Sequence, residues 1–169
     1  TIGGMIDVGP FFRSGRKGWF PSVTLQPSSA LYVVGFPAVV TMMRPSGDSS
    51  TVLCGGTSSG KTTFLNACLK SVDPHERIIT LEDTRELFPP QDNAVHLLAS
   101  RGDQGTANVT IQSLLEASLR MRPDRLFVGE VRGSEAFAFL RAINTGHPGS
   151  MSTVHADTPL GAYEQLAMM

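Results

Sequence analysis

The chain has 169 residues, of which 41% are hydrophobic and 17% charged, so it can bury one core of ordinary domain size and a two-domain enzyme is excluded. Its 14 basic and 15 acidic residues give a formal net charge of -1, which excludes a global field attracting nucleic acid or an anionic membrane. Its 2 cysteines are too few for a disulfide framework and indicate a reducing compartment, and no apolar run reaches the roughly 20 residues of a membrane span.

The first fifty residues differ in character from the rest of the chain. They contain scattered glycines and prolines and only short extended runs, at 31–34 and 39–43. The basic and aromatic stretch at 11–20 is more typical of a solvated loop than of a surface for single-stranded nucleic acid. We therefore divide the chain into a poorly defined N-terminal segment, residues 1–50, and a core, residues 51–169.

From residue 51 onward, short aliphatic runs alternate with helical patterns, which predicts βαβ units and a parallel sheet. The predicted strands are 51–54, 77–81, 94–98, 125–128 and 151–154. The predicted helices are 61–70, 110–120, 134–144 and a last one with Thr158 as N-cap and Pro159 at its first position. Because neither Gly nor Pro stops this last helix before Met169, we expect the natural polypeptide to continue.

The segment GGTSSGKTT matches the phosphate-loop pattern G-x-x-x-x-G-K-[ST] between a predicted strand and a predicted helix. Small residues let backbone N–H groups surround a phosphate, and the following helix adds its positive end. Lys61 would face the β and γ phosphates of ATP, and the Thr62 hydroxyl would ligate Mg²⁺. A ligand-free Gly/Ser turn is the less favoured alternative. The predicted binding residues are Gly55, Gly56, Thr57, Ser58, Ser59, Gly60, Lys61, Thr62 and Thr63.

Carboxylates follow two of the predicted strands. Glu82 and Asp83 come after RIITL, and Glu130 comes after LFV through Gly129, whose missing side chain allows a close approach. Ligands bind at the carboxyl ends of strands in open α/β sheets, and a bare carboxylate at a buried sheet end is costly. We therefore expect an acid beside Mg²⁺ and a group that orients water, although an ordinary solvated Glu remains the alternative at each position.

Two histidines, His147 and His155, lie in GHPGS and TVHAD. Zinc is not expected, because no third His or Cys stands at ligand spacing. A His at a strand end beside the phosphates can instead donate a hydrogen bond and sense the γ phosphate. A packed or solvated His is the alternative for each.

Several arginines occur in the same region and can contact developing phosphate charge. Each can equally form a salt bridge to an acidic neighbour such as Glu86, Asp124 or Glu135, so the choice stays open. The candidates are Arg85, Arg101, Arg120, Arg122 and Arg132.

Four motifs in series make residues 51–169 resemble the secretion or traffic ATPases, specifically the type IV secretion and conjugative-transfer branch, which is related to type II secretion and type IV pilus ATPases. GGTSSGKTT resembles the Walker A motif of this family, LEDTREL its acidic box, LFVGEVRGSEA its Walker B motif and NTGHPGSMSTVHADTP its His box. The phrases DTREL, LRMRPDR and INTGHPG favour the type IV branch over the type II branch. Residues 1–50 resemble the family's N-terminal domain nowhere.

The resemblance implies a RecA-like P-loop NTPase, truncated at both ends, that uses ATP and Mg²⁺. Within it, Glu82 would polarise water, Glu130 would lie near Mg²⁺ and His155 would sense the γ phosphate with support from His147. The catalytic set is completed by Arg85 and Arg132.

The resemblance also implies a motor subunit that acts as a homo-hexameric ring. Its expected place is the cytoplasmic face of the bacterial inner membrane, in contact with other secretion-channel components, without zinc or sequence-specific nucleic-acid binding. The alternatives are a type II secretion or type IV pilus ATPase, a small-molecule kinase or DNA motor, and a nucleotide-binding fragment without turnover.

Overall fold

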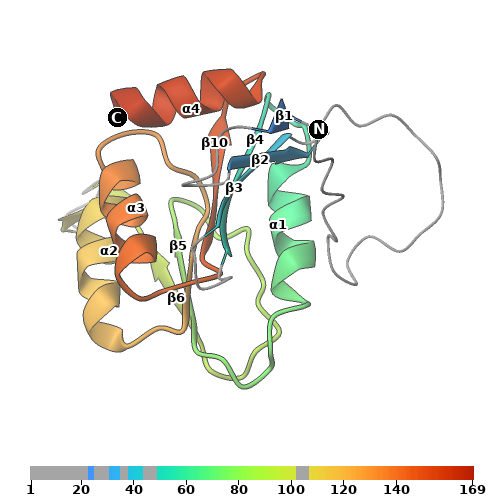
Figure 1. Ribbon diagram of the computed structural model, residues 1–169. Helices are drawn as coiled ribbons and strands as arrows, with labels where there is room; N and C mark the ends of the chain where they lie inside the picture. The colour runs from blue at the N-terminus through green and yellow to red at the C-terminus, as the bar shows by residue number, and fades with distance from the viewer. Residues whose placement is uncertain (1–22, 25–30, 35–37, 44–48, 102–106) are drawn as a thin grey trace.

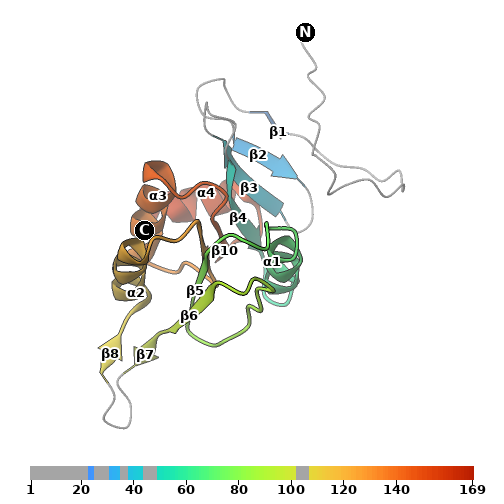
Figure 2. The ribbon, with the colours of Figure 1, turned by 90° about the horizontal axis from the view of Figure 1, so that it is seen from below.

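The fold is seen in a computed structural model that describes residues 23–24, 31–34, 38–43, 49–101 and 107–169. A sheet of 8 strands has the order β1-β2-β3-β4-β10-β9-β5-β6, and β7 and β8 form a separate pair (Figures 1 and 2). The strands are β1 Val23–Thr24, β2 Leu31–Val34, β3 Ala38–Met43, β4 Ser49–Gly55, β5 Ile78–Glu82, β6 Ala94–Leu98, β7 Ser100–Arg101, β8 Asn108–Val109, β9 Arg125–Val128 and β10 Met151–His155. The helices are α1 Lys61–Leu69, α2 Ile111–Ser118, α3 Glu135–Thr145 and α4 Pro159–Met168.

Strands β4, β10, β9, β5 and β6 run parallel, which confirms the predicted parallel sheet. Their carboxyl ends therefore meet at one edge, where the loops after β4, β5, β9 and β10 gather. Strands β3, β2 and β1 extend the sheet beyond β4 in antiparallel fashion. Strands from both sides of residue 50 thus share one sheet, and the division of the chain at that point stays a prediction.

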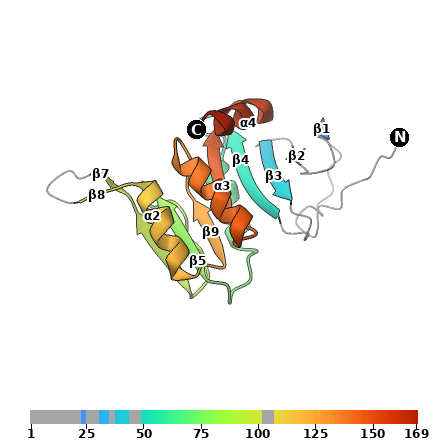
Figure 3. The same cartoon turned by 60° about the vertical axis from the view of Figure 1, so that its left-hand side comes forward.

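Helices cover both faces of the sheet, with α1 on one side and α2 and α3 on the other (Figures 1 and 3). Alternation along β4 explains this arrangement, because Leu53 belongs to the core cluster under α1 while Val52 and Cys54 belong to the cluster under α2 and α3. Helix α4 contacts β3 and adds Ala162 to the second cluster. Residues buried on both faces explain why the strands are continuous aliphatic runs.

The helix predicted over 110–120 is shorter in the structure. The Thr110 side chain accepts a hydrogen bond from the N–H of Ser113 at 3.1 Å, and α2 ends at Ser118. A 3₁₀ turn, Leu119–Met121, follows. Arg122 then adopts the left-handed conformation with a φ of 54°, and the helical segment ends there, before Pro123.

The amino edge of the parallel sheet is fastened by side chains that contact neighbouring strand ends. The Arg125 guanidinium forms an ion pair with Glu76, in which Nη2 lies 2.8 Å from Oε1. Asp124 accepts a hydrogen bond from the N–H of Arg77 at 2.6 Å. These contacts hold the starts of β5 and β9 together at the edge opposite the loops described below.

Gly149 is required at this amino edge, and Gly149→Ala is expected to lower the free energy of unfolding by about 1–3 kcal/mol. Its φ is 74°, and an added Cβ would lie 2.8 Å from Cζ of Arg125, whose guanidinium is held by Glu76. Urea unfolding measures the loss. Gly133→Ala is the matched control, because its Cβ would meet only the flexible Glu135 carboxylate at 3.3 Å. Equal midpoints for both variants would contradict the assignment.

Candidate functional site

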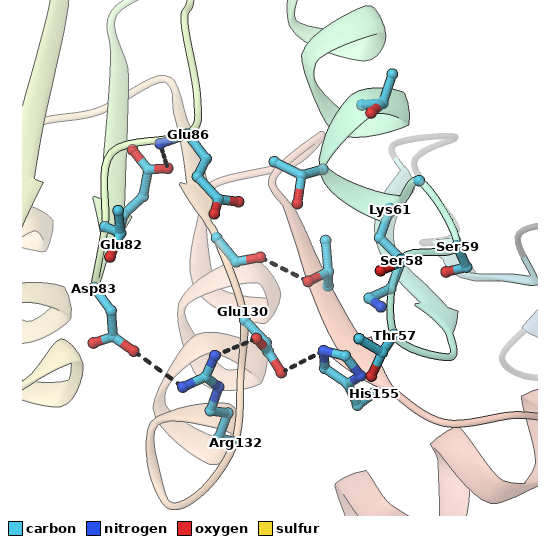
Figure 4. Close-up of a pocket in the computed structure, with 16 residues that line it drawn as sticks. Thr57, Ser58, Ser59, Lys61, Glu82, Asp83, Glu86, Glu130, Arg132 and His155 are labelled. Carbon is cyan, nitrogen blue, oxygen red and sulfur yellow. Dashed lines mark hydrogen bonds and ion pairs between the residues drawn. The ribbon is translucent and has the colours of Figure 1, made fainter.

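A cavity of about 490 Å³ opens at the carboxyl edge of the parallel sheet (Figure 4). Its wall is formed by residues 57–63 after β4, the acidic segment after β5, Glu130 and Arg132 after β9, and Thr153 and His155 from β10. The four segments that carried separate sequence motifs therefore surround one space.

The loop between β4 and α1 is shaped to surround an anion. Gly60 has a φ of 84°, a conformation that favours glycine, and it directly precedes α1. Lys61 is 7% exposed, and its ammonium donates to the carbonyls of Gly55 at 3.0 Å and Gly56 at 2.8 Å. Both acceptors are neutral, so a formal positive charge stays at the loop. This charge and the N-terminus of α1 fit a phosphate group.

Two side-chain oxygens at the cavity have no hydrogen-bond partner among the described residues. Ser59 Oγ lies in the loop, and an added Cβ at Gly55 would approach it to 2.5 Å, so the loop is closely packed there. Glu82, whose buried Oε2 is also without a partner, lines the cavity at the end of β5. A buried polar atom without a partner is unusual in a folded protein, and at this place it fits a site that a polar ligand, a metal or water completes.

Glu82 is 3% exposed, and only one of its carboxyl oxygens is bonded. Oε1 accepts from the N–H of Glu86 at 2.8 Å and of Leu87 at 2.9 Å. Burial raises the pKa of this carboxyl above its ordinary value of 4.5, and the negative charge of Glu86 adds to the rise. The two backbone hydrogen bonds and the nearby Thr80 hydroxyl lower the pKa in part. The group is thus held in a fixed orientation at the cavity wall.

Glu82→Gln is expected to raise Tm at pH 7, because glutamine carries no charge whose burial costs free energy. The folded state holds the Glu82 proton more tightly than the unfolded state, because burial raises the pKa, so wild-type stability falls as the pH rises above 4.5. Glutamine has no such loss. Melting curves from pH 4 to 7 should show the gain shrinking toward pH 4, and a pH-independent difference would contradict this cause.

Charged side chains from three strand ends form a chain along the cavity (Figure 4). The Arg132 guanidinium lies 2.7 Å from Oε2 of Glu130 and 3.4 Å from Oδ2 of Asp83. Glu130 Oε1 lies 3.3 Å from Nε2 of His155. Glu130 therefore has a basic partner on each oxygen, which holds its carboxylate at the ends of β9 and β10.

Close contact between β5 and β9 at this edge confirms the predicted role of Gly129. Its N–H donates to the carbonyl of Leu81 at 2.9 Å, and an added Cβ would lie 3.3 Å from Cγ of Glu82. Thr153, a residue that the sequence analysis missed, donates from Oγ1 to the Gly129 carbonyl at 2.7 Å. Its signal was a polar residue within a buried strand, two positions before His155.

Other predicted residues lie outside the cavity. His147 is at the amino edge, where Nδ1 lies 3.0 Å from the carbonyl oxygen of Pro123. Arg85 is exposed and its guanidinium carbon lies 5.8 Å from the centre of the Phe88 ring. Arg120 and Arg122 are exposed at the turn after α2. Of the four arginines at positions 85, 120, 122 and 132, Arg132 alone lines the cavity.

The described part of the chain shows neither a membrane-spanning helix nor a metal-binding cluster. No helix there is long and apolar enough to cross a bilayer. No group of three or more His, Cys, Asp or Glu side chains there is arranged to hold a metal ion. The absence of zinc stays a prediction.

A parallel α/β sheet with a phosphate loop at its carboxyl edge defines the class of P-loop NTPases. Within this class, residues 42–169 match the family described as type II/IV secretion system protein, and the chain belongs to that family. The predicted family and the predicted fold class are therefore confirmed.

Individual relatives agree with this membership. The type IV secretion system protein VirB11 of Bartonella quintana is 49% identical over 118 residues, which are 70% of this chain and 33% of the relative. The crystal structure of the VirB11 ATPase from the Brucella suis type IV secretion system, in complex with sulphate, has a TM-score of 0.64 and 39% identity, over 70% of this chain and 33% of that one. The pilus retraction motor PilT with bound ADP shares the fold, with a TM-score of 0.54 and 19% identity, over 89% of this chain and 51% of that one. The chain spans about a third of the length of its VirB11 relatives.

Proposed function

We propose that the chain is the ATP-binding and ATP-hydrolysing part of a motor subunit of a type IV secretion system. The observation that carries this proposal is the convergence of Lys61, Glu82, Glu130 and His155 on one cavity at the carboxyl edge of the sheet. Their four loops are far apart in sequence, and a merely structural loop would not need all four at one place.

The residues of the phosphate loop hold the nucleotide in this proposal. Backbone N–H groups of residues 55–63 face the phosphates, and the Lys61 ammonium exchanges its carbonyl partners for phosphate oxygens. Thr62 and Glu130 are the oxygen donors for Mg²⁺, which when bound neutralises charge on the β and γ phosphates.

The acidic and basic side chains opposite the loop act on the γ phosphate and on water. Glu82 orients the attacking water with its unbonded oxygen Oε2. His155 donates a hydrogen bond to the γ phosphate, so the position of its side chain depends on whether that phosphate is present. Arg132 is favoured over Arg85 as the arginine within the chain that contacts phosphate charge, because Arg132 lines the cavity. In the assembled protein, Arg85 stays available to a neighbouring subunit.

The type IV branch is proposed from the relatives. Identity is 49% to a type IV secretion protein and 39% to the Brucella VirB11 ATPase, against 19% to a pilus retraction motor. We extend this to a homo-hexameric ring at the cytoplasmic face of the bacterial inner membrane, in contact with other secretion-channel components. A type II secretion or type IV pilus ATPase is the alternative within the same family.

Phosphate release from purified protein with MgATP tests the proposed activity. Turnover that requires Mg²⁺ and disappears in Lys61→Ala is the expected result. Binding of MgATP by the wild type without phosphate release would overturn the hydrolytic part and favour the alternative of a nucleotide-binding fragment. Absence of both would overturn the proposal.

A further inference from the structure

Asn66, in the second turn of α1, bonds a segment that is distant in sequence. Its Nδ2 donates to the carbonyl of Glu86 at 2.8 Å, and its Oδ1 accepts from the N–H of Phe88 at 2.9 Å. Nδ2 also lies 3.2 Å from the carbonyl of Thr62, one turn earlier in α1. The amide orientation is fixed, because exchanging oxygen and nitrogen would oppose donor to donor at Phe88 and acceptor to acceptor at Glu86.

The same segment, residues 86–88, also orients Glu82. Glu82 Oε1 accepts from the N–H groups of Glu86 and Leu87, so the peptide unit between Glu86 and Leu87 is bonded to Glu82 through its N–H and to Asn66 through its carbonyl oxygen. The Glu82 carboxylate and α1 are thereby joined through one short piece of backbone. The first residues of α1, Lys61 and Thr62, line the cavity that Glu82 also lines.

We infer that Asn66 is a positioning residue that sets the Glu82 carboxylate at a fixed place relative to the phosphate loop. This inference rests on the proposed function of the cavity. Asn66 does not line the cavity, so its effect passes through Glu86 and Leu87 to Glu82. A side chain that orients a reacting group matters because a displacement of about 1 Å in a site can cost on the order of a hundredfold in rate.

The buried side chain of Leu87 allows the positioning role of Asn66 to be tested without unfolding the protein. Leu87 is fully buried in the cluster that contains Leu65 and Leu69 of α1, so an apolar anchor keeps the segment on the helix when the Asn66 amide is absent. Asn66→Ala should therefore leave the protein folded. The backbone at Glu86 and the Glu82 carboxylate bonded to it would no longer be held at a fixed position relative to α1.

Nucleotide affinity and turnover distinguish positioning from binding. In Asn66→Ala we expect kcat for MgATP to fall about tenfold or more, while the dissociation constant for MgATP changes less than about twofold. In Asn66→Asp, kcat should fall similarly. The carboxylate still accepts a hydrogen bond from the N–H of Phe88, but its second oxygen faces the carbonyl oxygen of Glu86, where a donor is needed. Gln165→Ala, which removes an amide from α4 outside the cavity, is the matched control and should keep wild-type kcat.

A double variant tests whether the effect passes through Glu82. In the Glu82→Gln background, Asn66→Ala should cause no further loss in single-turnover hydrolysis, since residues that act as one unit are not additive. A full additional tenfold loss, or wild-type kcat in Asn66→Ala, would overturn the inference.

Amide hydrogen exchange supplies a measurement that does not need turnover. Asn66→Ala should speed exchange at Glu86, Leu87 and Phe88 about tenfold or more, with no change in the exchange of β9. Unchanged exchange at Glu86 and Leu87 would overturn the inference even in a protein that hydrolyses nothing. Conversely, a wild type without turnover would overturn the proposed function while the exchange experiment still decides whether Asn66 holds this segment.

Discussion

Lys61→Ala is expected to weaken MgATP binding by about a hundredfold or more, the loss that two charge-assisted hydrogen bonds of about 1.5–3 kcal/mol each would produce. Lys61 is 7% exposed in the loop, and its ammonium donates to the neutral carbonyls of Gly55 and Gly56. Alanine removes the positive charge that a phosphate would meet. It removes no residue of either apolar core cluster, so the fold should persist.

Titration with a fluorescent ATP analogue measures this affinity, and circular dichroism checks the fold. Lys70→Ala is the control, because Lys70 is exposed at the other end of α1 and should keep wild-type affinity. Equal affinities of Lys61→Ala and wild type would refute the assignment of the phosphate loop.

Much of the fold could be predicted because its strands are buried on both faces. Such strands are short aliphatic runs, and the structure has β9 at Arg125–Val128, as predicted, with its last three residues buried. The end of the helix predicted over 110–120 differs from the structure, because a 3₁₀ turn and the left-handed conformation of Arg122 follow α2. The pairing of β1, β2 and β3 could not be predicted, because antiparallel register depends on tertiary contacts that short runs do not specify.

Parts of the site that follow strand ends could also be predicted, because parallel strands bring their carboxyl ends together. His147 shows the limit of this argument. It shares a sequence motif with His155, but β10 runs between them, and its five residues Met151–His155 span about 13 Å at about 3.3 Å per residue. Proximity of His147 to His155 in the sequence therefore did not indicate that the two side chains lie at opposite edges of the sheet. Asn66 was missed because its partners are 20 and 22 residues away.

Glu82→Gln is expected to keep MgATP binding and to lower kcat by about 10²–10⁴, the usual contribution of a positioned acid or base. Glu130→Gln, which removes a proposed oxygen donor of Mg²⁺, is expected to lower kcat to a similar extent. Glu130 lies between Arg132 and His155, so glutamine removes the charge that both basic groups meet. Glu82 has one unbonded oxygen at the cavity, and glutamine replaces a basic carboxylate there with a neutral amide. The change at Glu82 acts on the transition state more than on the bound nucleotide.

The two variants differ in what they do to the rest of the site, which makes their comparison informative. Glu130→Gln should also weaken the ion pair between position 130 and Arg132, and with it the placement of Arg132 beside Asp83. Glu82→Gln leaves the contacts of Arg132 intact. Steady-state phosphate release gives kcat, and a nucleotide titration gives the dissociation constant. Glu116→Gln, an exposed substitution of the same type on α2, should match wild type in both. Wild-type turnover in Glu82→Gln with loss in Glu130→Gln would move the water-orienting role from the end of β5 to the end of β9.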